Sequence, residues 1–147
     1  MSAGDVVVDD HLLLQVLLGE EPDGLRPVGG RVATTGLWYH RLCRALADTR
    51  ITGSLSRALG GVDDRTAAAT VRAVIELPES IELVSLRTLA WPMADLLVDG
   101  VRGNLLTLEA LAVARHLSAD LCIAEEDASP QIIDAAEAVG IEVRRIG

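Results

Sequence analysis

Near its amino terminus the chain reads Val6-Val7-Val8-Asp9-Asp10-His11-Leu12-Leu13-Leu14. Three consecutive β-branched residues predict a short strand buried on both faces, as in the interior of a parallel sheet. Two carboxylates end this run, and apolar residues at helical spacing follow at once. Because open α/β folds bind their ligands at the carboxyl edge of the sheet, Asp9 is the first candidate for a functional residue.

Strand and helix patterns alternate along the rest of the chain. We expect further strands at residues 31–34, 81–85, 121–124 and 141–146. Between and after them we expect helices at residues 37–46, 51–59, 66–77, 88–98, 105–117 and 130–139. This alternation predicts a single domain over residues 1–147, an α/β/α sandwich of three layers with a mainly parallel sheet of four or five strands.

Local signals fix several of the expected helix ends. Thr34 or Thr35 can cap the helix at 37–46, and Asp63 or Asp64 the helix at 66–77. Pro92 would then lie in the first turn of the helix at 88–98, where proline is tolerated because the first-turn N–H groups have no intrahelical partner.

Composition narrows the classes of function. The chain has 147 residues, half of them apolar, and a formal net charge of −9. This charge argues against tight non-specific binding to a phosphate backbone, but it allows an acidic site that meets nucleic acid through a bound cation. Cys43 and Cys122 lack the spacing of a zinc site or a disulfide framework, which favours a reducing cytoplasm. No signal peptide or membrane-spanning run is evident, so we expect a cytoplasmic protein without a membrane partner.

Glu109 is the second candidate, because it projects from an apolar helix face. Its helical neighbours at i−4, i−3, i+3 and i+4 are all apolar. An ionised carboxylate in such a place is costly unless it is paired or bound to a metal. The alternative is an edge residue that reaches solvent or pairs with Arg102.

A third acidic group, Glu125-Glu126-Asp127, follows the expected strand at 121–124. One of its members can point toward Asp9, while the others are expected to face solvent. Carboxylates at two strand ends and on an inward helix face repel one another unless a divalent cation lies among them. Hard oxygen ligands suit Mg²⁺ or Mn²⁺.

Several segments together resemble the PIN-domain family, which includes the VapC-like ribonuclease toxins of bacterial toxin–antitoxin pairs. Val7-Val8-Asp9 looks like the family's opening strand, whose Asp is the first metal ligand, and Leu108-Glu109-Ala110 resembles the start of its Asp-Ala-x-x-Val-Ala helix. Residues 121–125, 129–136 and 140–143 are similar to the family's ending. The chain departs from the family at His11, where Ser or Thr is usual, and at Arg41, where the family has its second acid; shifting the alignment by one residue places His40 there.

The resemblance implies cation-assisted hydrolysis of an RNA phosphodiester. Asp9, Glu109 and Glu125 would hold Mg²⁺ or Mn²⁺, and His40 could serve as a ligand or as a general base. It also implies a homodimer, and a small antitoxin partner if the protein is a toxin. The alternative is a catalytically impaired PIN-fold protein that acts as a dimeric interaction or regulatory module, because the acid expected near position 41 is missing.

Overall fold

The computed structural model describes residues 4–48 and 60–147 and contains a five-stranded, entirely parallel sheet. Its strands, in the spatial order β3-β2-β1-β4-β5, are β1 (Val6–Val8), β2 (Val32–Thr34), β3 (Ile81–Leu83), β4 (Asp120–Ala124) and β5 (Val143–Ile146). The described helices are α1 (Asp10–Leu18), α2 (Gly36–Ala47), α4 (Asp64–Ile75), α5 (Leu86–Val98), α6 (Leu105–Leu117), the short 3₁₀ helix η1 (Glu125–Asp127) and α7 (Pro130–Ala138). The predicted α/β fold class is confirmed.

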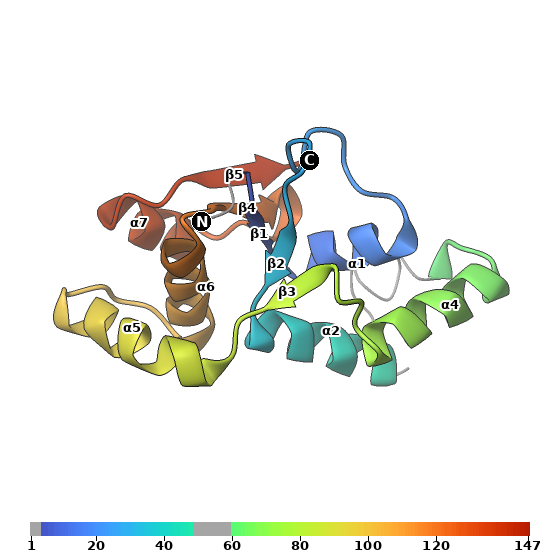
Figure 1. Ribbon diagram of the computed structural model, residues 1–147, viewed down its shortest axis with the longest axis horizontal. Helices are drawn as coiled ribbons and strands as arrows, with labels where there is room; N and C mark the ends of the chain where they lie inside the picture. Colours follow the sequence, from blue (N-terminus) through green and yellow to red (C-terminus); the bar gives the residue numbers. More distant parts are fainter. Residues whose placement is uncertain (1–3, 49–59) are drawn as a thin grey trace.

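Helices cover both faces of the sheet and make three layers. In Figure 1, α1, α2 and α4 lie on one side of the strands, and α5, α6 and α7 lie on the other. The chain moves outward from β1 to β2 and β3, then returns across the sheet to β4 and β5. Because parallel crossovers are right-handed, reversing the direction of travel transfers the connecting helices to the opposite face.

The central strand β1 explains why both faces need covering. Val7 belongs to the core cluster that contains α5, α6 and α7, whereas Val6 and Val8 belong to the cluster on the α1 side. This is the two-residue alternation of a strand, and all three valines are buried. An apolar run without polar interruptions is therefore what a strand between two helical layers requires.

Side-chain caps begin two helices as the sequence predicts. The Thr35 hydroxyl accepts a hydrogen bond from the Trp38 backbone N–H at the start of α2 (3.0 Å), and Asp63 accepts one from Thr66 at the start of α4 (2.7 Å). The helix expected at residues 51–59 lies outside the described residues.

The prediction for Pro92 is wrong. Helix α5 begins at Leu86, two residues earlier than expected, so Pro92 lies in the helix interior beyond the first turn. The N-cap residue of α5 is Ser85, whose side chain makes no capping hydrogen bond.

Two further observations concern the thiols and the helix lengths. Cys43 and Cys122 are both free. None of the helices in the described part of the chain is long and apolar enough to cross a membrane.

Candidate metal centre

The strand order places the candidate site at the carboxyl ends of β1 and β4. β1 pairs with β2 on one side and with β4 on the other, and the chain runs outward from β1 in one direction and from β4 in the other. Between β1 and β4 the strand order therefore reverses. In open parallel sheets, ligands bind in the crevice outside the carboxyl ends of the strands at such a point. Asp9 follows β1 directly, and η1 follows β4 directly.

Asp9 is buried and its carboxylate joins these two strand ends. Its Oδ1 accepts a hydrogen bond from the Leu12 N–H and so caps α1, while its Oδ2 accepts one from the Ala124 N–H at the end of β4, each at 2.9 Å. Asp9 is the only residue between β1 and α1, and it has an extended backbone at the N-cap position of α1. Its side chain can therefore reach both the first turn of α1 and the end of β4. Each oxygen keeps a further lone pair for another ligand.

Asp10, the first residue of α1, is equally buried but has a different partner. Its Oδ2 lies 3.0 Å from Nε of Arg41, a half-exposed side chain of α2. The pair is not aligned as a hydrogen bond, so the buried Oδ2 has no hydrogen-bond donor among the described residues. The guanidinium therefore compensates the charge of Asp10 without saturating its oxygen.

Asp127, in η1, completes a group of three carboxylates with Asp9 and Asp10. One ligand oxygen from each lies within 4.8 Å of the other two. Asp9 and Asp10 are buried and Asp127 is exposed, so the group opens to solvent on the η1 side. Three carboxylate oxygens, one of them without a hydrogen bond, could hold a metal ion.

The pKa values of Asp9 and Asp10 are both raised, as expected for buried carboxylates that lack sufficient positive charge nearby. Burial raises the pKa of Asp9 to about 6, and the nearby carboxylates of Asp10 and Asp127 add to this, while the N–H bonds from Leu12 and Ala124 oppose it. Burial also raises the pKa of Asp10, and Arg41 acts in the opposite direction. The cluster thus holds carboxylates whose ionised forms are disfavoured unless a cation is present.

His11 lies beside the cluster rather than in it. Its Nδ1 is 3.1 Å from Oε1 of Glu126 and 3.7 Å from Oδ2 of Asp127. When protonated, His11 contributes a positive charge between the two η1 carboxylates. The position at which the resemblance expects a hydroxyl therefore carries a side chain that contacts the acidic segment after β4.

Glu109 is buried as expected from its apolar neighbours, but its partner is neither Arg102 nor the three-carboxylate group. Its Oε1 accepts a hydrogen bond from the Leu37 N–H in the first turn of α2 (2.8 Å). A Cβ at Gly36 would lie 3.3 Å from Oε2, so the glycine allows this close approach. The carboxylate thus satisfies a free N–H at a helix N-terminus, where negative charge is stabilised. A role for Glu109 as a metal ligand stays a prediction.

The other predicted site residues are not in the group either. Glu125 lies near the carboxyl terminus, with Oε2 3.3 Å from the place of a Cβ at Gly147. His40 is exposed on α2. The structure therefore joins one predicted residue, Asp9, with Asp10 and Asp127.

The sequence contained a signal for Asp127 but a weak one for Asp10. Asp127 belongs to the acidic triplet of which one member was expected to face Asp9. Asp10 reads as an ordinary acid in the first turn of a helix, where negative charge is favourable in solvent. Its burial depends on α2 and η1, which are distant in sequence.

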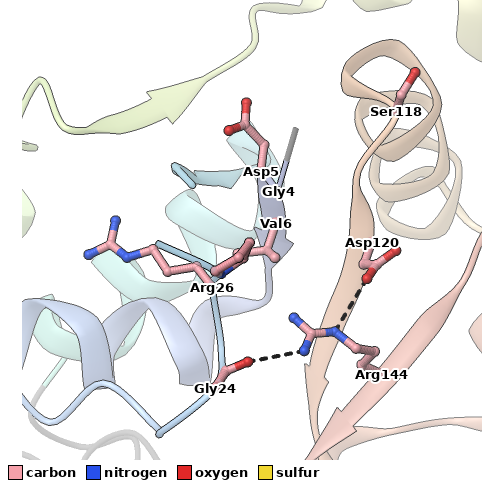
Figure 2. Close-up of a pocket in the computed structure, with 9 residues that line it drawn as sticks. Gly4, Asp5, Val6, Gly24, Arg26, Ser118, Asp120 and Arg144 are labelled. Atoms are coloured by element: carbon pink, nitrogen blue, oxygen red, sulfur yellow. Dashed lines mark hydrogen bonds and ion pairs between the residues drawn. The ribbon is translucent and has the colours of Figure 1, made fainter. Parts of the chain in front are cut away.

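A polar cavity of about 400 Å³ lies at the opposite, amino-terminal edge of the sheet. Figure 2 shows Arg144 of β5 between Asp120 and the Gly24 carbonyl. The guanidinium also contacts the Leu25 carbonyl and the Cys122 sulfur. These contacts tie the loop after α1 to β4 and β5, so we assign Arg144 a structural role.

Comparison with known proteins identifies no family or function for the chain. The chain matches no profile of a protein family and no curated protein.

Proposed function

We propose that the protein is a ribonuclease that depends on Mg²⁺ or Mn²⁺ held by Asp9, Asp10 and Asp127. The observation that carries the proposal is the convergence of three carboxylates, from two adjacent strand ends, at the point where the sheet order reverses. The likeness to PIN domains supplies the substrate class. In this proposal the protein belongs to a toxin–antitoxin pair and binds a small antitoxin.

Each residue has a distinct part in the site. Asp9 is fixed by two backbone N–H groups, which orient its remaining lone pairs. Asp10 offers its buried Oδ2, and Asp127 lies on the open side that substrate approaches. A divalent cation held by these residues would supply an activated water and would offset negative charge on a phosphate, both during hydrolysis and against the net charge of −9 of the chain.

The position of Arg41 favours a second candidate function. Its guanidinium lies against Asp10, at the place where the resemblance expects an acid. A fixed positive charge already provides part of what a metal would provide. In this second case the protein is a catalytically impaired relative that works as an interaction or regulatory module.

Calorimetric titration with Mn²⁺ tests the first function. We expect the native protein to bind Mn²⁺ in the micromolar range and Asp10→Asn to lose at least about tenfold in affinity, since a buried oxygen ligand is removed. Asp134→Asn, an exposed acid of α7, serves as the matched control and should bind as the native protein does. Cleavage of a labelled RNA should follow the same order and stop with a chelator.

Arg41→Ala separates the two functions. If the native protein binds no Mn²⁺ but Arg41→Ala does, the arginine closes the site and the second function holds. If the native protein binds Mn²⁺ and cleaves RNA, the second function is contradicted. Arg44→Ala removes an exposed charge from the same helix and controls for the change in net charge. Absence of binding in both the native protein and Arg41→Ala would overturn the cation site itself.

A further inference from the structure

A cavity of about 420 Å³ (the β4–β5 cavity) lies beside the acidic cluster, at the carboxyl ends of β4 and β5. Its walls come from α1, η1 and these two strand ends. His11 belongs to both places, since it lines the cavity and its Nδ1 is 3.7 Å from Oδ2 of Asp127. Ala124, another lining residue, donates its N–H to Asp9. A ligand in this cavity therefore lies next to the three carboxylates.

Two of the polar side chains that line the β4–β5 cavity have no partner in the described chain. Neither the Glu125 carboxylate nor the Gln15 amide forms a hydrogen bond or an ion pair with the rest of residues 4–48 and 60–147. Glu126, by contrast, lies against His11, with its Oε1 3.1 Å from Nδ1. Polar groups that converge on a cavity and lack internal partners are available to orient a ligand.

The charges around the β4–β5 cavity argue against an anion as its occupant. Glu125 and Glu126 both line it, and none of its lining residues in the described part of the chain is an arginine or a lysine. Carboxylates repel a phosphate and accept hydrogen bonds, so a fitting ligand is neutral and presents N–H groups. Ala124 and Ile146 add apolar surface to the walls.

A nucleobase meets these requirements. It has two apolar faces and a polar edge, and a base can stack on an imidazole such as that of His11. The volume of the cavity lies within the range of about 300–1,000 Å³ that is typical of small-molecule sites. Because the cavity adjoins the acidic cluster, an RNA whose base occupies it has a phosphate within reach of Asp127.

The acceptors of Glu125 favour guanine among the four bases. The Watson–Crick edge of guanine presents two adjacent donors, N1–H and the N2 amino group, which match the two oxygens of a carboxylate. Adenine and cytosine have a ring-nitrogen acceptor in place of N1–H, and uracil has one donor between two carbonyl groups, so each turns an acceptor toward the carboxylate. The amide of Gln15 can donate to O6 of guanine, which completes the match.

We propose that the β4–β5 cavity binds a guanine base of the RNA, next to the bond that is cleaved. Glu125 accepts hydrogen bonds from N1–H and N2–H of the base, and Gln15 donates one to O6. The link to cleavage rests on the proposed ribonuclease function, whereas the recognition of guanine rests on the cavity. A nucleoside, which has no phosphate, therefore tests the recognition without metal and without cleavage.

Calorimetric titration with the four nucleosides, in the absence of divalent metal, is the first experiment. We expect guanosine to bind at least about tenfold more tightly than adenosine, cytidine or uridine, because each of these leaves an acceptor unpaired. Glu125→Gln should lose at least about tenfold in guanosine affinity, since an ionised acceptor is replaced by an amide. Glu137→Gln makes the same exchange at an exposed position of α7 and should bind as the native protein does. Circular dichroism checks that both variants are folded.

Equal affinities for the four nucleosides overturn the guanine site, as does the absence of guanosine binding up to about 1 mM. Titration of Glu125→Gln with Mn²⁺ separates base recognition from cation binding. We expect its Mn²⁺ affinity to stay within about threefold of the native value, because Glu125 is outside the three-carboxylate group. A larger loss would assign Glu125 to the cation and would overturn its role in base recognition.

Cleavage of a labelled RNA in the presence of Mn²⁺ distinguishes failure of this inference from failure of the proposed function. We expect cleavage next to guanosine, and a loss of that preference in Glu125→Gln. Cleavage by the native protein without preference for guanosine would leave the ribonuclease function standing and overturn the guanine site. Guanosine binding that depends on Glu125, in a protein that neither binds Mn²⁺ nor cleaves RNA, would support the guanine site and overturn the ribonuclease function.

Discussion

Asp9 is a buried carboxylate that must ionise at neutral pH, and this has a measurable cost. Its pKa is about 6 in the folded chain against 3.8 ordinarily, so between these values the folded state binds more protons than the unfolded state. Stability therefore falls as the pH rises through this range, by about 3 kcal/mol in all between roughly pH 3 and pH 7 from this residue alone. The raised pKa of Asp10 acts in the same direction.

Denaturant unfolding of the native protein and of Asp9→Asn, at several pH values without divalent metal, measures this cost. We expect the stability difference between the two proteins to shift in favour of the variant as the pH rises through 4–6, because Asn cannot ionise. Mn²⁺ should reduce the native slope, since a cation lowers the pKa of its ligands. Parallel stability curves for the two proteins would show that Asp9 carries no such cost.

Glu109 provides a second prediction, which separates a structural carboxylate from a metal ligand. Glu109→Ala should lower the free energy of unfolding by about 3 kcal/mol, because it leaves a cavity and an unpaired Leu37 N–H. Glu109→Gln keeps an acceptor for that N–H and should cost about 1 kcal/mol through lost charge at the α2 N-terminus. Denaturant unfolding measures both.

Manganese affinity tests whether Glu109 is also a metal ligand. If the carboxylate serves only α2, Glu109→Gln should bind Mn²⁺ within about threefold of the native protein. A much larger loss of affinity in a folded Glu109→Gln variant would instead assign Glu109 to the metal.

For individual residues, the sequence predicts the burial of Asp9 and Glu109 better than it predicts which groups they contact. Asp9 follows from a strand that ends at a charge, and Glu109 from its four apolar helical neighbours. The partner of Glu109 is a backbone N–H 72 residues away, and that of Asp10 is a guanidinium on another helix. Such contacts depend on helix placement across the sheet, which local patterns do not encode.

Among the described elements, α5 has a local sequence that conflicts with its structure. Pro92 has no N–H for the Thr88 carbonyl, so the helix lacks a bond in its interior. Pro92→Ala should raise the free energy of unfolding by about 1–2 kcal/mol, after allowance for the greater freedom of the unfolded chain. Thermal unfolding should show a higher midpoint; an unchanged or lower one would mean that the proline ring contributes packing that offsets the missing bond.

The other described elements were largely predictable, and the exceptions have local causes. All five strands lie where the sequence predicts them: the central strands β1, β2 and β4 are buried almost throughout, and the partly exposed edge strands β3 and β5 follow alternating or β-branched patterns. The start of α5 was misplaced because the alternation at residues 81–85 extends past the end of β3 at Leu83. Hydrogen bonding to β2 ends there, and Val84 and Ser85 lead into the helix.

For the molecule as a whole, the position of β1 predicts an uneven distribution of stability. Its strand pairs with both β2 and β4, whereas β3 pairs with β2 alone and β5 with β4 alone among the described strands. In native-state hydrogen exchange, amides of Val7 and Leu121 should therefore exchange only through global unfolding. Amides of β3 should exchange faster; equal protection of β1 and β3 would contradict this order.

The pairing of β1 with β4 also decides when the acidic cluster can form during synthesis of the chain. Asp9 and Ala124, which share a hydrogen bond, are 115 residues apart. At roughly 5–20 residues per second, the ribosome releases the first strand on the order of ten seconds before its partner exists. A nascent or prematurely terminated chain that ends before residue 120 therefore has neither β4 nor Asp127, and cannot assemble the acidic cluster. In the proposed nuclease, truncated copies that end before β4 therefore lack the cation site.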